Sequence, residues 1–104
     1  MKFYKHLYVG ASIKNPKAVK IKLKINAGLI GIYIVALADG PDQLEFYHAA
    51  LLKQKLLRKL CPPYIIGIAK GREEAENIIE KIAGECYEKT GTAKLKDYLL
   101  NKKG

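Results

Sequence analysis

Lysine side chains in one short segment are the groups in this chain whose type and spacing best suit chemistry, and that chemistry is anion binding. Residues 19–25 alternate apolar side chains with Lys20, Lys22 and Lys24. A period of two puts alternate residues on opposite faces of a β-strand. We therefore predict a strand from Ala18 to Ile25 with one buried apolar face. Its lysines would project together from the other face, towards water or an anionic partner.

Aromatic residues near the N-terminus extend this prediction to nucleic acid. A strand from Phe3 to Val9 would place Tyr4, His6 and Tyr8 on one face. If the first three strands are neighbours, these side chains share a face with the lysines. Aromatic rings interleaved with cations stack the bases of single-stranded RNA or DNA. The predicted nucleic-acid-binding face comprises Tyr4, His6, Tyr8, Lys20, Lys22, Lys24 and Tyr33. The alternative is an ordinary half-exposed sheet face, where tyrosine and lysine stems cover apolar surface.

The distribution of charge also favours a polyanionic partner. The formal net charge is +9, and residues 1–38 hold seven lysines and no acidic residue. Residues 39–71 hold five basic and three acidic residues, whereas residues 72–104 hold seven of each. Such a field favours association with nucleic acid or another polyanion. Composition bias is the competing explanation, because 17 lysines stand against 2 arginines, and arginine is the residue suited to bidentate phosphate recognition.

A second candidate site is a pocket for an anion or small ligand. The turn from Gly67 to Arg72 joins a predicted strand to a helix, where exposed amides can hold a phosphate. Ligands of α/β sheets sit at the carboxyl ends of parallel strands. The pocket would therefore comprise Asp39, Gly67, Lys70, Gly71 and Arg72. Ordinary helix capping is the alternative, since three glutamates between residues 73 and 76 would repel an anion.

The motifs of hydrolytic enzymes are incomplete in this chain. Gly31-Ile32-Tyr33 and Tyr8-Val9-Gly10 resemble the halves of the GIY-YIG nuclease signature, but in reversed order. Pro41-Asp42 resembles the opening of the PD-(D/E)xK nuclease motif, yet the predicted fourth strand has no carboxylate that could help hold Mg²⁺. We predict no catalytic residue, no metal site and no cofactor, and favour a protein that is not an enzyme.

Cysteine usage and hydropathy predict the compartment. Cys61 and Cys86 are too few and too far apart for a disulfide framework or a metal clip. The N-terminus lacks the apolar core of a signal peptide. The longest apolar run, residues 27–38, is shorter than the roughly 20 residues of a membrane helix. We therefore expect a cytoplasmic protein with reduced thiols and no membrane partner.

These candidate residues must be positioned by seven predicted elements in the order βββαβαα. Beyond the two strands above, we predict a turn at 26–28, a strand at 32–38 and a helix starting at Asp39-Gly40 and running to Leu60. A strand at 64–69, a helix at 71–89 and a short helix after Thr92 follow. The predicted fold is a two-layer α+β domain spanning residues 1–104, with a mixed four-stranded sheet and helices on one face. The third and fourth strands should form a right-handed parallel crossover.

Surplus apolar surface favours a homodimer. In the predicted helix 39–60, Leu44, Leu51 and Leu52 fall outside the main apolar side. The strand at 32–38 is also apolar on both faces. Unpartnered apolar stripes of this kind suggest a subunit contact.

The stretch from Ile32 to Leu99 resembles a set of small uncharacterised bacterial proteins. The resemblance is carried by the strand Ile32–Leu37, the run Leu44–Gln54 and the segment Gly67–Gly71 before a helix. No activity is assigned to that group, so the resemblance implies a single α+β domain and supplies no site.

The sequence therefore favours a macromolecule-binding protein that takes up nucleic acid through a basic sheet face. The alternative is an enzyme or ligand-binding protein with a pocket at the ends of the third and fourth strands. If the strand orientation is right, Ile21→Lys or Leu23→Lys should impair folding, because a charge would enter the core. Unchanged thermal stability in either variant would contradict that orientation.

Overall fold

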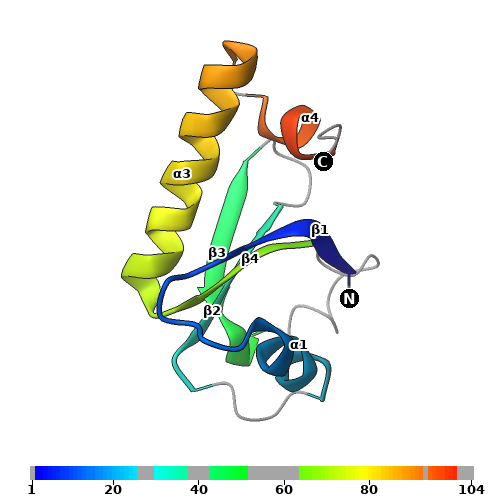
Figure 1. The fold of residues 1–104 in the computed structure, drawn as a ribbon, viewed down its shortest axis with the longest axis vertical. Coiled ribbons are helices and arrows are strands. Elements are labelled where there is room, and N and C mark those ends of the chain that lie inside the picture. Colours follow the sequence, from blue (N-terminus) through cyan, green and yellow to red (C-terminus); the bar gives the residue numbers. More distant parts are fainter. Residues whose placement is uncertain (1, 26–29, 38–42, 52–63, 93, 101–104) are drawn as a thin grey trace.

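The computed structural model describes residues 2–25, 30–37, 43–51, 64–92 and 94–100. Figure 1 shows the elements in chain order. They are β1 (Lys2–Val9), α1 (Pro16–Ile25), β2 (Ile32–Leu37), β3 (Leu44–His48), the 3-10 turn η1 (Ala49–Leu51), β4 (Tyr64–Lys70), α3 (Arg72–Thr90) and α4 (Leu95–Leu100). The predicted turn at 26–28 lies outside the described residues.

The four strands form one mixed sheet in the order β1-β4-β2-β3. β1 runs parallel to β4, whereas β2 runs antiparallel to both β4 and β3. The predicted fold class, an α+β protein with a mixed four-stranded sheet, is confirmed. The predicted parallel crossover between the third and fourth strands is wrong, since the segments concerned, β2 and β4, are antiparallel.

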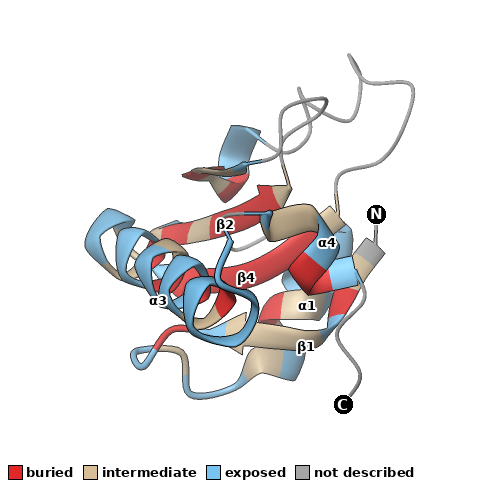
Figure 2. Cartoon of the chain, turned by 90° about the horizontal axis from the view of Figure 1, so that it is seen from above, coloured by how far each residue is buried: buried red, intermediate tan, exposed pale blue. Residues whose placement is uncertain are grey.

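Helices cover both faces of this sheet, whereas the sequence predicted helices on one face only. On one face, Val19 and Leu23 of α1 pack against a cluster that includes Ile34 and Ile68. On the other, α3 and α4 pack on Val35 and its neighbours (Figure 2). Both apolar faces of β2 are therefore covered within one chain, so its composition no longer argues for a homodimer.

The lysine-rich segment is the helix α1 and not the predicted strand. Its start is a capped turn, in which the Asn15 side-chain oxygen accepts a hydrogen bond from the Ala18 N–H at 3.2 Å. Asparagine at the N-cap followed by proline at the first helical position is a favourable helix start. A period-two pattern also places apolar residues four apart, so a helix can bury Val19 and Leu23 together.

The segment predicted as the first half of a long helix contains β3. Residues Leu44–His48 pair with β2 in antiparallel register, with Val35 opposite Phe46 and Tyr33 opposite His48. Aromatic side chains suit this pleated surface, and pairing with β2 outweighs the weak helix propensity of the segment. The rest of that predicted helix, apart from η1, lies outside the described residues.

The other predicted elements are confirmed with small changes in their ends. β1, β2 and β4 coincide with the predicted strands within one or two residues. The predicted long helix is α3, and Gly91 ends it in the left-handed conformation with φ 70°. The predicted short C-terminal helix is α4.

We predict that Leu23→Ala and Ile21→Ala differ sharply in their effect on the free energy of unfolding. Leu23 is 1% exposed and fills the core beneath α1, whereas Ile21 is 60% exposed. The strand orientation that assigned Ile21 to the core is therefore wrong. Leu23→Ala should cost about 2–5 kcal/mol, and Ile21→Ala should stay within about 0.5 kcal/mol. Urea unfolding followed by circular dichroism measures both, and equal losses would contradict the helical register of α1.

Candidate nucleic-acid interface

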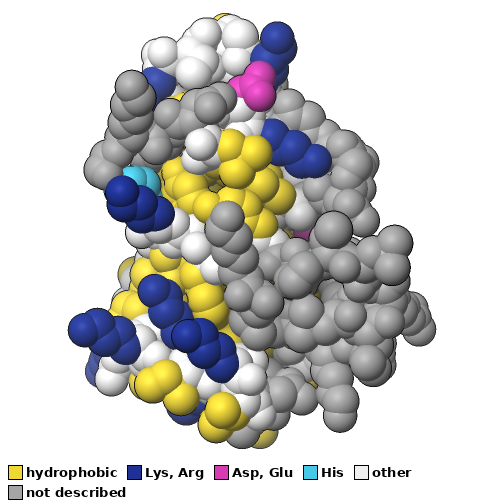
Figure 3. Space-filling view, turned by 90° about the vertical axis from the view of Figure 1, so that its right-hand side faces the viewer, with side chains coloured by type: hydrophobic (Ala, Val, Ile, Leu, Met, Phe, Trp, Pro, Cys, Tyr) yellow, Lys and Arg dark blue, Asp and Glu magenta, His cyan; other side chains and the backbone are white. Residues whose placement is uncertain are grey.

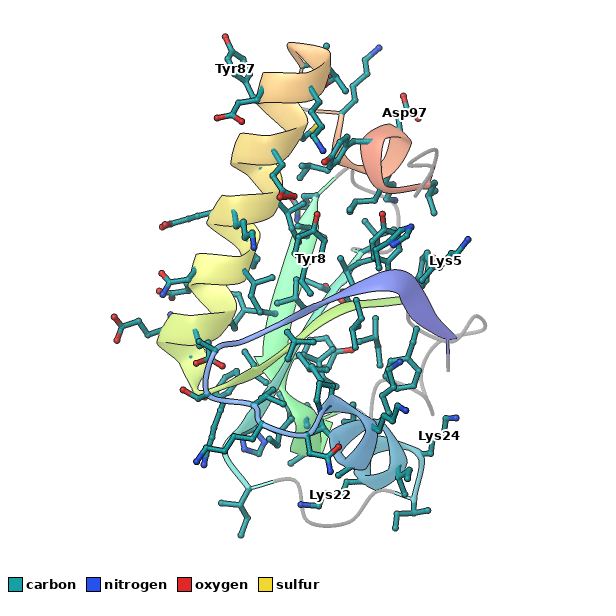
Figure 4. All side chains as sticks on the ribbon, in the orientation of Figure 1. Lys5, Tyr8, Lys22, Lys24, Tyr87 and Asp97 are labelled. Carbon is teal, nitrogen blue, oxygen red and sulfur yellow. The ribbon has the colours of Figure 1, made fainter. Side chains whose placement is uncertain are left out.

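The lysines of α1 surround the exposed side of the helix. Val19 and Leu23 face the sheet, so residues between and beyond them point to solvent. Figure 4 shows Lys22 and Lys24 projecting from α1, and Lys5 projecting from β1. Lys20 is partly buried and its Nζ lies 5.5 Å from the centre of the Phe3 ring, a cation–π distance. Figure 3 shows basic side chains among hydrophobic ones at this end of the molecule.

A groove lies between the strand β1 and the start of α1, and we call it the β1 groove. Its volume is about 680 Å³. The described residues of its lining include no carboxylate and are Lys5, His6, Leu7, Val9, Asn15, Pro16, Lys17 and Lys20. The groove therefore combines three cations and one histidine with an apolar floor.

A second basic cavity of about 400 Å³ lies on another side of α1. Lys14, Lys22 and Lys70 line it together with polar and apolar residues, and no carboxylate is among the described residues of this lining. Lysines from the loop before α1, from α1 itself and from the end of β4 thus converge around one helix. We call the surface formed by the two cavities and α1 the basic surface.

Acidic side chains gather on a different element. α3 carries six glutamates and three basic residues, and the pair Arg72–Glu76 is joined by a contact of 3.1 Å. α3 and α1 pack on opposite faces of the sheet, although Glu74 of α3 reaches the backbone of Lys70 and Ser12 beside the second cavity.

The predicted aromatic–lysine sheet face does not exist as one surface. Tyr4, Tyr8 and Tyr33 belong to the cluster under α3 and α4, with Tyr4 only 4% exposed. Lys20, Lys22 and Lys24 lie on α1, on the other side of the sheet. His6 is the exception, because it lines the β1 groove beside Lys5 and Lys20.

The tyrosines under α3 act in packing. The Tyr8 hydroxyl donates a hydrogen bond to Oε1 of Glu85 at 2.6 Å, and burial together with this bond raises the pKa of Tyr8. Burial likewise raises the pKa of Tyr4, whose ring stacks nearly parallel to that of Tyr8 with centroids 6.4 Å apart. Both phenols therefore stay neutral at physiological pH.

The predicted pocket at the ends of the third and fourth strands is not assembled among the described residues. Ile32, the first residue of β2, pairs with Lys70, so the C-terminal end of β2 lies at the opposite edge from Lys70. Asp39 lies outside the described residues. Gly67 is buried in the sheet, and the Gly71 N–H already donates to the Gly31 carbonyl at 2.9 Å.

Arg72 from the same predicted pocket is also engaged. Its guanidinium lies 5.6 Å from the centre of the Phe46 ring, in addition to its pairing with Glu76. Of the four predicted pocket residues that the structure describes, Lys70 alone lines the basic surface.

Glu74 is a structural residue that the sequence prediction treated as one of three glutamates that complement the helix dipole and repel an anion. Its two carboxylate oxygens accept hydrogen bonds from the backbone N–H of Lys70 at 3.0 Å and of Ser12 at 3.2 Å. It thereby ties the loop after β1 to the start of α3. A glutamate three residues after the cap Gly71 has the spacing of a capping box, which is the signal in the sequence for this role. Gly10 leaves room for the carboxylate, because a Cβ there would overlap Oε1 of Glu74.

The described residues offer neither a metal site nor a membrane-spanning helix. No group of three or more His, Cys, Asp or Glu side chains in the described ranges could hold a metal ion. None of the helices in those ranges is both long and apolar enough to cross a membrane.

The chain was also compared with known proteins. No protein-family model, no curated protein and no solved structure matches it. The case for a site therefore depends on the residues and geometry described above.

We predict that Gly10→Ala and Glu74→Ala are not additive in their effects on the free energy of unfolding. The added methyl group would displace the Glu74 carboxylate from its two backbone partners, which Glu74→Ala also removes. Each single variant should lose about 1 kcal/mol, since the bonds are exposed to solvent. The double variant should lose less than the sum of the two. Additive losses in urea unfolding would show that Gly10 and Glu74 act independently.

We also predict that Glu74 contributes stability that depends on pH. Burial raises the pKa of this carboxyl, but hydrogen bonds from Lys70 and Ser12 and the charge of Lys70 outweigh burial, so the pKa in the folded state is below its ordinary value. A lowered pKa means that the contribution is present above pH 4.5 and is lost as the pH falls through the folded-state pKa. Glu74→Gln should therefore lose stability at neutral pH and show a flatter acid limb. An acid limb that matches the wild type would contradict this role.

Proposed function

We propose that the protein binds nucleic acid through the basic surface around α1. The observation that supports this most directly is the lining of the two cavities beside α1. Six lysines from four segments of the chain converge there, and among the described residues no carboxylate lines either cavity, although the charge of Lys70 also acts on Glu74. These lysines are Lys5, Lys14, Lys17, Lys20, Lys22 and Lys70. Neutralising several neighbouring phosphates is the main source of affinity in such complexes.

The residue types favour contact with the phosphate backbone over recognition of base sequence. Lysine is a flexible point charge, whereas bidentate contacts to guanine or phosphate are typical of arginine. The chain has only two arginines, Arg58 and Arg72, and Arg72 pairs with Glu76. The proposed binding is therefore strongly dependent on salt and weakly dependent on sequence.

One lysine argues for binding because it does not help the helix. Lys17 lies in the first turn of α1, which holds no acidic residue, although the positive end of the helix dipole disfavours a cation there. Lys22 and Lys24 lie in the last turn, where they also stabilise the helix. An anion bound near Lys17 would offset the unfavourable placement.

The proposal includes a cytoplasmic location, which would bring the basic surface together with nucleic acid. The predicted homodimer stays a prediction, and β1 and β3, the outer strands of the described sheet, are the places where a second copy would extend it. A role as an enzyme gains no support from the described residues, in which the predicted pocket is dispersed.

We predict that Lys20, Lys22 and Lys24 changed together to Gln weaken the binding of labelled RNA and DNA. The slope of log affinity against log salt should fall by about 0.7–0.9 for each phosphate that the variant no longer neutralises. A matched control changes Lys81, Lys89 and Lys94 to Gln, which removes the same charge from the other side of the sheet. Fluorescence anisotropy over a salt series measures both variants, with circular dichroism to confirm folding.

If both triple variants weaken nucleic-acid binding equally, the binding depends on net charge alone. That result would contradict the assignment of the binding site to the basic surface. Unchanged affinity in the Lys20, Lys22 and Lys24 variant would contradict it as well. Heparin serves as the reference polyanion. The proposal is supported if heparin displaces nucleic acid no better than its charge predicts and if nucleic acid binds the protein more tightly than heparin does.

A further inference from the structure

We infer that the β1 groove takes the unpaired bases of a single-stranded nucleic acid, so that the protein prefers single strands to duplexes. This inference rests on the proposed function and names its substrate class. It is argued from the free edge of β1, from the chemistry of the groove lining and from the position of α1 beside it.

β1 offers backbone groups that the sheet does not use. It lies at the end of the strand order, so β4 is its one neighbour in the described sheet. The parallel register passes from Phe3 opposite Ile65 to Tyr8 opposite Gly67, an advance of five residues on β1 against two on β4. The intervening residues of β1 therefore leave regular pairing, as in a bulge. Backbone groups on the outer edge of a strand at the end of a sheet face away from its neighbour, and there they can meet the polar edges of a base.

The lining of the groove contains both apolar side chains, which suit the face of a base, and cations, which suit a phosphate. Leu7, Val9 and Pro16 supply apolar surface for the face of a base. Lys5, Lys17 and Lys20 supply cations for the phosphates that flank it. The volume of about 680 Å³ lies within the range of about 300–1,000 Å³ that is usual for small-molecule pockets.

His6 is the polar group of the groove that lacks a partner. Its Nε2 atom is shielded from solvent and has no hydrogen-bond partner among the described residues. A buried polar atom without a partner is costly, so a ligand that reaches it gains from pairing with it. Its ring packs edge-on against Tyr4 with centroids 5.8 Å apart, so a base would have to displace the side chains that cover Nε2 in order to pair with it.

α1 adds to the preference for an anion at this position. Asn15, Pro16 and Lys17 line the groove at the N-terminal end of the helix, where the backbone dipole is positive. A duplex presents its phosphates but keeps its bases stacked and paired, so it can use the lysines without filling the apolar floor. A single strand can use both, because its bases can be splayed out into a pocket.

The test compares a single-stranded oligonucleotide with the duplex of the same sequence, at one salt concentration, on wild type and two variants. Wild type should bind the single strand about five- to a hundredfold more tightly, in line with the contribution of one base contact. His6→Ala should reduce most of that preference and leave duplex affinity nearly unchanged. Ile21→Ala, on the exposed side of α1 and outside the groove lining, is the matched control and should alter neither affinity.

A second measurement keeps the inference falsifiable if His6→Ala does not fold. A single strand carrying a photoreactive base should crosslink to residues 5–9 or 15–20 of the wild-type protein. Crosslinks confined to other segments would overturn the inference, as would equal affinity for single strand and duplex. In both of those outcomes the lysine variants can still weaken binding, which would preserve the proposed function. Loss of the proposed function is recognised separately, by lysine variants that bind like wild type.

Discussion

The burial of β4 is the constraint on which the rest of the structure depends. Its residues from Ile65 to Ala69 are all buried, and their side chains point to both faces of the sheet. A strand that is apolar on both faces needs cover on both. α3 and α4 cover one face of the sheet. The other face is covered by an element from the N-terminal part of the chain. That element is α1.

The basic surface follows from the way α1 covers the sheet. α1 has a narrow apolar stripe, formed by Val19 and Leu23, and everything else on its exposed side is lysine or isoleucine. Because the sheet holds the stripe inward, the lysines are held outward and beside the free edge of β1. A change that loosened the packing of α1 on the sheet would therefore disturb stability and anion binding together.

Sequence patterns correctly predicted the elements for which periodicity, capping and turn residues all indicate the same secondary structure. The apolar strands β2 and β4 and the capped helix α3 are examples. The α1 segment was mispredicted because alternation of apolar residues with lysine satisfies a strand and also places Val19 and Leu23 four apart. The helix start at Asn15-Pro16 was the signal that separates these possibilities. β3 was mispredicted because its strand character comes from pairing with β2, which is a tertiary interaction.

For the candidate site, the sequence predicted an anionic partner, which stays a prediction, and it placed the site on the wrong kind of element. The excess of lysine before residue 38 favoured an anionic partner, and Lys20, Lys22 and His6 do lie at the basic surface. The prediction that Tyr4 and Tyr8 share this surface is wrong, because both belong to the face of the sheet that α3 covers. The contribution of Lys5, Lys14 and Lys17 depends on β1 being an edge strand next to α1. Strand order is a property of the whole sheet, so no local pattern in the sequence contains it.

The crowding of like charge around α1 links ligand binding to the stability of the fold. Lysines that converge on one helix repel one another, and in the free protein this repulsion opposes the packing of α1. A polyanion that spans α1 and β1 removes the repulsion and adds contacts on both sides of the groove. Since it binds the folded chain better than the unfolded one at this site, it shifts the folding equilibrium towards the native state. If the proposed binding occurs, the same lysines destabilise the free protein slightly and stabilise the complex.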